Sequence, residues 1–105
     1  MAKTSPTQRS LALLREEGYH CEIVEKWNSF TRTRKDLWGW ADILAIRRGE
    51  VLAVQVTSGS NTSAREKKIA DSEITPKVRE AGIRIEVHGW RKLKAGWACK
   101  RIILD

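Results

Sequence analysis

The apolar runs Trp40-Ala-Asp-Ile-Leu-Ala-Ile46 and Val51-Leu-Ala-Val-Gln-Val-Thr57 flank the turn Arg47-Arg48-Gly49-Glu50. Two such runs, rich in β-branched residues and joined by a short turn that contains glycine, predict an antiparallel β-hairpin. Both runs are apolar on both faces, which is typical of strands in the middle of a sheet that is covered on each side. The hairpin is therefore expected to form the centre of the fold.

Counting outward from the turn predicts a small polar patch on this hairpin. If Arg48 and Gly49 form a two-residue loop, the ladder sets Asp42 directly opposite Gln55, and Thr57 lies on the same face. Polar side chains in strands this apolar are costly to bury without partners. The three residues therefore predict either an internal hydrogen-bonded network or a site that faces a ligand, a metal or water.

The sequence on either side of the hairpin predicts one domain over residues 1–105, because the chain is long enough for a single core and short for two. Capping and periodicity predict helices over residues 5–18, 63–70 and 75–82, the second opened by a capping box of Ser63 with Glu66. Strands are predicted over residues 20–26, 83–88 and 97–104, and the polar segment 27–36 is predicted to be a loop. This order favours an α/β fold with a mixed central sheet flanked by helices.

Charge points to a polyanionic partner. Twenty lysines and arginines against 13 acidic residues give a net charge of +7 and an isoelectric point near 9.9, so nucleic acid is the leading candidate. The sequence has no apolar run long enough to span a bilayer, which argues against a membrane partner. It also lacks the apolar stretch of a secretory leader, so a cytoplasmic location is predicted. Cys21 and Cys99 are accordingly expected to be reduced thiols.

Aromatic residues are interleaved with basic ones around the predicted loop. This mixture suits stacking on unpaired bases and neutralisation of phosphates, so it predicts nucleic-acid contacts by Lys26, Arg32, Arg34, Lys35 and Trp38, beside Trp27 and Phe30. The other tryptophans, Trp40, Trp90 and Trp97, are expected to pack in the core or under a lid. His20 and His88 lack metal-ligand spacing and are expected at the surface or at a strand edge.

The element order, with Asp42 near the start of one strand and Gln55-Val56-Thr57 near the end of the next, resembles the PD-(D/E)XK nuclease superfamily. The closer likeness is to its small archaeal Holliday-junction-resolvase-like and VRR-NUC-type members, over residues 8–58. The resemblance implies an αβββαβ restriction-endonuclease-like core, here followed by a C-terminal strand. It also implies metal-dependent phosphodiester hydrolysis, and leaves a homodimer open because small members commonly pair.

Carried over residue by residue, the resemblance makes Asp42, the Gln55 amide oxygen and the Val56 carbonyl ligands of a weakly held Mg²⁺ or Mn²⁺. Gln55 stands at an acidic position, and Thr57 stands where the superfamily has its lysine. The carboxylate that small resolvases place in the first helix is also missing, since residues 7–9 carry none. Candidate replacements are Lys67 as the catalytic cation, Lys68 as an alternative cation or phosphate contact, and Glu16 or Glu25 as the second carboxylate.

Three functional hypotheses follow from these observations. The first is an endonuclease that cleaves DNA, with branched or junction DNA among its candidate substrates, through Asp42, Gln55, Thr57 and Lys67. The second is a nuclease-fold DNA- or RNA-binding module without catalysis, which the replacement of the lysine by Thr57 favours. The third is a basic protein-interaction domain. Whether the chain is an enzyme stays open at this level.

Overall fold

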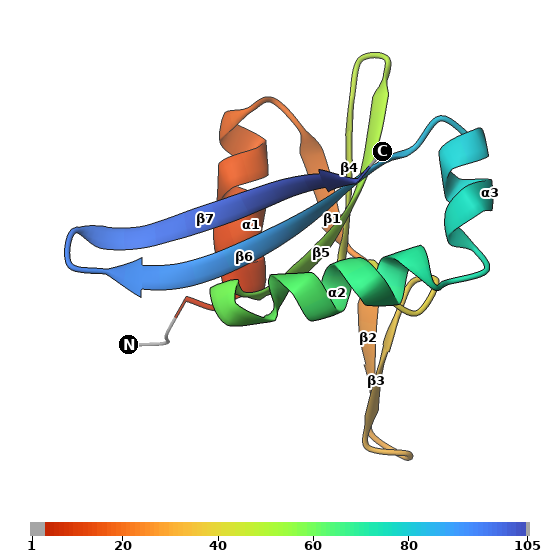
Figure 1. Ribbon diagram of the computed structural model, residues 1–105, viewed down its shortest axis with the longest axis horizontal. Helices are drawn as coiled ribbons and strands as arrows, with labels where there is room; N and C mark the ends of the chain where they lie inside the picture. Colours follow the sequence, from red (N-terminus) through yellow and green to blue (C-terminus); the bar gives the residue numbers. More distant parts are fainter. Residues whose placement is uncertain (1–3, 105) are drawn as a thin grey trace.

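The computed structural model describes residues 4–104 and places five strands in one mixed sheet (Figure 1). The sheet order is β1-β4-β5-β6-β7, in which β5 and β6 are parallel and the other neighbours antiparallel. The elements are α1 (Pro6–Glu16), β1 (His20–Ile23), β2 (Glu25–Asn28), β3 (Thr33–Asp36), β4 (Ile43–Arg47), β5 (Glu50–Ser58), the 3₁₀ turn η1 (Gly59–Asn61), α2 (Thr62–Ala70), α3 (Thr75–Glu80), β6 (Arg84–Leu93) and β7 (Gly96–Leu104). The predicted α/β class with a mixed sheet is confirmed.

The central hairpin has the predicted register. Arg47 pairs with Glu50 across the two-residue turn, and the ladder continues to Ile43 opposite Val54. Gly49 takes a φ of +75°, a conformation that glycine adopts without a steric penalty. The next pair along this register is Asp42 and Gln55.

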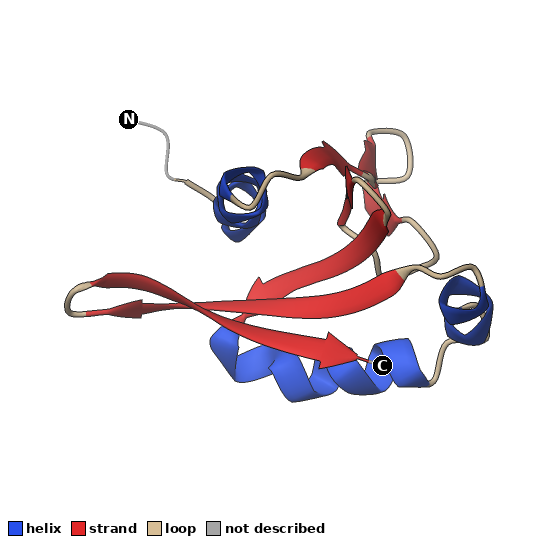
Figure 2. Cartoon of the chain, turned by 90° about the horizontal axis from the view of Figure 1, so that it is seen from above, coloured by secondary structure: helices blue, strands red, loops and turns tan. Residues whose placement is uncertain are grey.

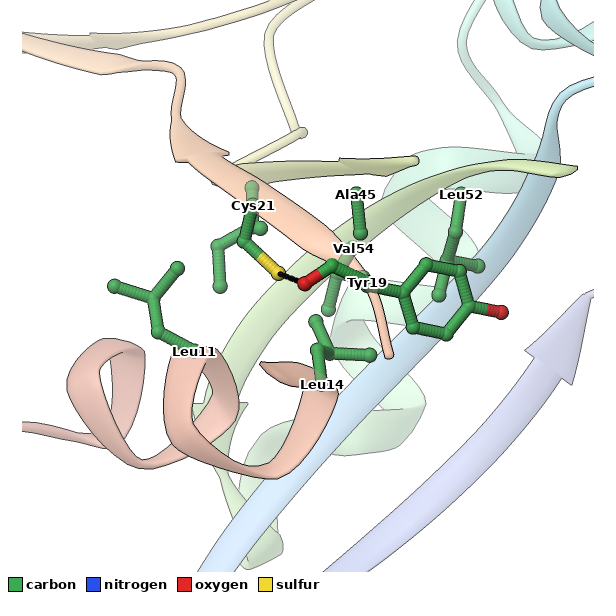
Figure 3. Close-up of a cluster of buried hydrophobic side chains, with 8 residues drawn as sticks. Leu11, Leu14, Tyr19, Cys21, Ala45, Leu52 and Val54 are labelled. Atoms are coloured by element: carbon green, nitrogen blue, oxygen red, sulfur yellow. Dashed lines mark hydrogen bonds between the residues drawn. The ribbon is translucent and has the colours of Figure 1, made fainter. Parts of the chain in front are cut away.

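Each face of the sheet is covered by a helix, as Figure 2 shows from above. Leu11 and Leu14 of α1 pack on β1, β4 and β5, and the cluster they form includes Tyr19 and Cys21 (Figure 3). The opposite face carries a second cluster that contains Trp40, Ile69 of α2 and Val78 of α3. Because successive strand residues point to opposite faces, β5 contributes alternately to the two clusters. Residues 4–104 contain no helix with the length and apolar character that a bilayer crossing requires.

A buried polar network ties α1 to β6 and β7, and it overturns the prediction that His88 lies at the surface or at a strand edge, since His88 is paired with both β5 and β7. His88 is fully buried, with Nδ1 2.9 Å from the Ser10 hydroxyl and Nε2 3.0 Å from Glu86 Oε1. The indole N–H of Trp90 also donates to the Ser10 hydroxyl, and the Arg101 guanidinium donates to Glu86. Each polar group of a buried network needs a partner, and here every one of these side chains has one. The periodicity of β6 did not reveal that its polar face is covered by α1.

The network predicts how stability depends on pH. Burial would raise the pKa of Glu86, but hydrogen bonds from His88 and Arg101 hold it below its ordinary value of 4.5. A depressed folded-state pKa stabilises the fold above the unfolded pKa, and this contribution is lost as the pH falls through the folded pKa. We expect Glu86→Gln to lower the free energy of unfolding at neutral pH by about 3 kcal/mol. The difference in unfolding free energy between the variant and the parent should become smaller below about pH 4.5. Thermal melts followed by circular dichroism across this range test it; parallel stability curves would contradict it.

The predicted loop over residues 27–36 is instead a second small sheet. The predicted strand over residues 20–26 is interrupted at Val24, whose N–H donates to the Asp42 carbonyl, and the chain then enters β2, which pairs with β3. At the tip, the Asn28 side chain accepts hydrogen bonds from the N–H groups of Phe30 and Thr31, and Arg32 takes a positive φ of 53°. The β2–β3 hairpin projects away from the main sheet (Figure 1).

Three smaller predictions also need correction. Helix α2 begins at Thr62 with Asn61 as its N-cap and no side-chain capping bond, so the predicted capping box of Ser63 is wrong. Strand β6 runs on to Leu93 because it pairs with β7 from Ile85 to Leu93. Trp40 is buried as predicted, but Trp97 is 43% exposed and lies against Arg9. Cys21 and Cys99 are both free.

Candidate functional site

A cavity of about 430 Å³ lies at the end of the sheet where β5 ends. It is bounded by the start of α1, the residue that precedes β4, the end of β5, the base of the β2–β3 hairpin and Arg65 of α2. The N-terminal turn of a helix presents free N–H groups and the positive end of the helix dipole. In α1, Pro6 has no N–H and the Gln8 N–H donates to the Ser5 hydroxyl, so the helix dipole and the Thr7 N–H are what favour an anionic group in this cavity.

Asp42 and Gln55 meet in the cavity wall, as the hairpin register predicts. Asp42 Oδ2 accepts a 2.8 Å hydrogen bond from Gln55 Nε2 and a 2.7 Å hydrogen bond from the Val56 N–H. Asp42 and Gln55 are 4% and 3% exposed, and Thr57 lines the same cavity. The pairing fixes the carboxylate from two sides.

The Gln55 amide oxygen is buried and has no hydrogen-bond partner within residues 4–104. The amide orientation follows from its partners, because turning the amide over would bring its oxygen against the Val56 carbonyl and against the Asp42 oxygen that already accepts the Val56 N–H. A buried acceptor without a donor costs about 1–3 kcal/mol. This oxygen thus fits a site that gains a cation or another electron-pair acceptor.

Three carboxylates converge at the same place. Glu25, Asp36 and Asp42 each offer an oxygen, and these oxygens lie within 4.8 Å of one another. Glu25 and Asp36 are paired across the base of the β2–β3 hairpin. Burial, followed by the nearby charges of Asp36 and Glu25, raises the pKa of Asp42 to about 7 despite the Val56 hydrogen bond. Arg34 offsets part of this negative charge, and a cation among the three carboxylates would offset more of it.

These donors fit a hard divalent cation. Three carboxylates, the Gln55 amide oxygen and the carbonyl of Val56, a residue that lines the cavity, form a set made only of oxygens. Mg²⁺ and Mn²⁺ prefer such ligands, whereas zinc sites are usually built with histidine or cysteine. The group expected from the resemblance is therefore compatible with the residues present.

Two arginines supply positive charge to the cavity lining. Arg34 of β3 lies 3.8 Å from Glu25, and Arg65 reaches the cavity from the first turns of α2. The structure does not bring the predicted cation Lys67 to the cavity, since it is exposed and bonds to Asp71. Lys68 is exposed on the same helix and does not line the cavity either.

The predicted nucleic-acid residues are divided among several surfaces. In a two-stranded ladder, Arg34 shares a face with the Glu25–Asp36 pair, whereas Lys26 and Lys35 oppose each other on the reverse face. Arg32 lies exposed near the hairpin tip. Trp38 is half-buried and lines a small apolar cavity beside α3. Its ring centroid lies 5.8 Å from that of Trp40. Of this group, only Arg34 lines the acidic cavity.

The sequence predicted Glu25 only as one of two candidates for the second carboxylate of the site. It did not predict that Asp36 and Arg65 would line the same cavity. The alternative carboxylate, Glu16, lines a different depression beside Trp90. Asp36 could have been predicted from a hairpin pattern in this segment. A turn over residues 28–32, which begins with Asn28, is flanked by two strands of equal length. Pairing Glu25 with Asp36 would have followed from that register.

Comparison with known proteins gives no match to a family model and no significant match to a curated protein or to a solved structure.

Proposed function

We propose that this chain is a metal-dependent nuclease of the PD-(D/E)XK type that hydrolyses phosphodiester bonds in nucleic acid. The observation that carries the proposal is the cluster of three convergent carboxylates in one cavity with Gln55, whose buried amide oxygen has no hydrogen-bond partner within residues 4–104. A purely structural network would be expected to satisfy this buried oxygen. The net charge of +7 and the helix start at the cavity rim support a polyanionic substrate.

In this proposal each residue of the chain has a defined task. Asp42, Glu25, Asp36, the Gln55 oxygen and the Val56 carbonyl would hold Mg²⁺ or Mn²⁺, which when bound lowers the pKa of water and neutralises charge on the phosphate. Asp42 is oriented by the Val56 N–H and by Gln55. The guanidinium groups of Arg34 and Arg65 bind the phosphodiester oxygens together with the Thr7 N–H, because Pro6 has no N–H and the Gln8 N–H donates to the Ser5 hydroxyl. Arg65 takes over the charge that Thr57 cannot supply.

A cleavage assay tests the proposal. We expect labelled flapped, branched or single-stranded DNA to be cut with Mg²⁺ or Mn²⁺ and left intact in chelator. Replacing Glu25 and Asp36 together with glutamine and asparagine should slow cleavage by at least about 100-fold, because the cation loses two charged ligands. Glu22→Gln, at an exposed position of β1, is the matched control and should cut like the parent.

A second candidate function is nucleic-acid binding without catalysis, which the presence of Thr57 at the lysine position favours. It predicts affinity that falls with salt and does not respond to chelator. If the parent cuts none of these substrates with either metal, or if the double variant cuts as fast as the parent, the nuclease proposal is wrong.

A further inference from the structure

The two most exposed large apolar side chains within residues 4–104 both lie on the β2–β3 hairpin, which projects away from the main sheet in Figure 1. Phe30 at the tip is 98% exposed, and Trp27 of β2 is 61% exposed. Tryptophan is a large residue that is highly buried on average. Most of the Trp27 surface is thus left open to a partner of the chain.

The register of the hairpin places Trp27 on the face of the acidic cavity. Glu25 pairs with Asp36, and Trp27 pairs with Arg34. Side chains two residues apart on a strand point to the same face, and so do directly opposite side chains. Glu25, Asp36 and Arg34 all line the acidic cavity. Trp27 therefore occupies the next position outward from the carboxylates on this face, about 7 Å along β2 from Glu25.

The two faces of the hairpin carry different chemistry. On the reverse face Lys26 lies opposite Lys35, and the other pair on that face is polar and uncharged. On the cavity face Trp27 and Arg34 are direct neighbours, with Cβ atoms about 5 Å apart. Among the paired residues of this hairpin, an aromatic ring and a cation thus occur together only on the face that adjoins the cavity.

Arg34 keeps most of its hydrogen-bonding capacity for a ligand. Its side chain is 63% exposed, and its ion pair within residues 4–104 is a 3.8 Å contact with Glu25. A guanidinium has five N–H donors and favours phosphate oxygens. The turn beyond this residue is fixed, because the Asn28 side chain accepts hydrogen bonds from the N–H groups of Phe30 and Thr31. The hairpin therefore presents a cation and an aromatic residue side by side on a preorganised support.

A cation beside an exposed aromatic ring fits a nucleotide whose base is unpaired. The cation binds the phosphate, and the ring stacks on the base. Inside a duplex both faces of each base are covered by the neighbouring base pairs, so a side chain stacks only on a base that has left the stack or lies at an end. The pairing of Trp27 with Arg34 therefore favours an unpaired nucleotide over a continuous duplex.

We infer that Trp27 stacks on the unpaired base of the nucleotide next to the phosphodiester that enters the acidic cavity, while Arg34 binds the phosphate. The inference rests on the proposed function for the place of that phosphodiester. The preferred substrate is then a single strand, a flap or a bulge with an unpaired nucleotide beside the bond that is cut. Any of the bases serves, because each has a flat face on which the indole can stack.

Fluorescence anisotropy with labelled DNA in chelator tests the stacking without cleavage. We expect Trp27→Leu to weaken binding of a single strand about 10-fold and binding of a long duplex by no more than about 2-fold. Trp27→Phe should bind the single strand as the parent does, because stacking needs only an aromatic face. The matched control is Trp97→Leu, at an exposed tryptophan of β7 that does not line the acidic cavity, and it should bind like the parent.

Cleavage kinetics then test whether the stacked base lies next to the cut. After the cut has been mapped, a single abasic nucleotide is placed on each side of the bond in turn. At one of the two positions we expect the parent to cut about 10-fold more slowly. Trp27→Leu should cut the intact strand about 10-fold more slowly as well, and the two changes together should give little further loss, because they remove the same contact.

The outcomes separate this inference from the proposed function. A parent that never cuts, but whose single-strand affinity depends on Trp27, would overturn the nuclease proposal and support the stacking. A single-strand affinity that is the same in the parent and in Trp27→Leu would overturn the stacking, whether or not the parent cuts. Equal losses for single strand and duplex, or losses that simply add in the cleavage experiment, would also overturn it. Thermal melts confirm that each variant is folded.

Discussion

Replacing Asp42 with asparagine is expected to abolish cleavage and, in chelator, to make the protein more stable. Asparagine keeps an oxygen at the Oδ2 position, where it can accept from both the Val56 N–H and the Gln55 amide N–H. The substitution also removes one of three mutually repelling carboxylates at a site where burial disfavours charge. We expect the free energy of unfolding to rise by about 1–2 kcal/mol.

The measurement is a pair of thermal melts, in chelator and with excess Mg²⁺ or Mn²⁺, together with the cleavage assay. The parent should gain stability from the metal, because a ligand that binds only the native state stabilises it. Asp42→Asn should gain much less and should cut at least about 1,000-fold more slowly. The matched control is Asp71→Asn at the exposed C-cap of α2, which should change the free energy of unfolding by no more than about 0.5 kcal/mol. A variant that is less stable than the parent in chelator would indicate that Asp42 serves the fold and not a site.

The central hairpin could be predicted from the sequence because its information is local. A glycine at the turn and two apolar runs determine the register, and the register alone brings Asp42 to Gln55. The exact sheet order required more, because the parallel pairing of β5 with β6 depends on how α2 and α3 cross between them. Periodicity within a single strand does not contain that information.

The rest of the site depends on contacts that local patterns do not encode. The segment 25–36 is polar on both faces, since its hairpin projects from the main sheet and buries little apolar surface. A strand without a buried face gives no alternating pattern, and so Asp36 was assigned to a loop. His88 shows the converse, because a polar residue in an alternating strand looked exposed until α1 supplied Ser10 as its partner.

The position of a basic residue around the axis of α2 determines whether its side chain reaches the cavity. Arg65 and Lys67 are two residues apart, which rotates their side chains by about 200° around the helix axis. The buried positions of α2 are Thr62 and Ile69, and the half-buried Arg65 reaches the cavity whereas Lys67 points to solvent. The sequence offered several basic residues on this helix, and its weak amphipathic pattern did not distinguish among them.

Gln55→Glu is expected to make the stability of the fold depend on metal. The substitution introduces the acid that the PD-(D/E)XK motif of the proposed function has at the matching position, but it replaces the amide that donates to Asp42 at 2.8 Å with a fourth carboxylate. In chelator, two buried like charges in contact should lower the free energy of unfolding by about 3 kcal/mol. A divalent cation reverses the sign of that interaction, since both oxygens then become ligands.

The melting temperature of Gln55→Glu should therefore rise more on addition of Mg²⁺ than that of the parent, and cleavage should be retained or increased. Gln55→Met provides the matched control, because it has nearly the same volume but neither the amide donor nor the oxygen that would ligate the cation. The melting temperature of Gln55→Met should not change on addition of Mg²⁺, and this variant should cleave more slowly than the parent. If glutamate and methionine at position 55 gave the same response to metal, the Gln55 oxygen would not face a cation, and the cavity at the end of β5 would have to be explained as part of the structural core.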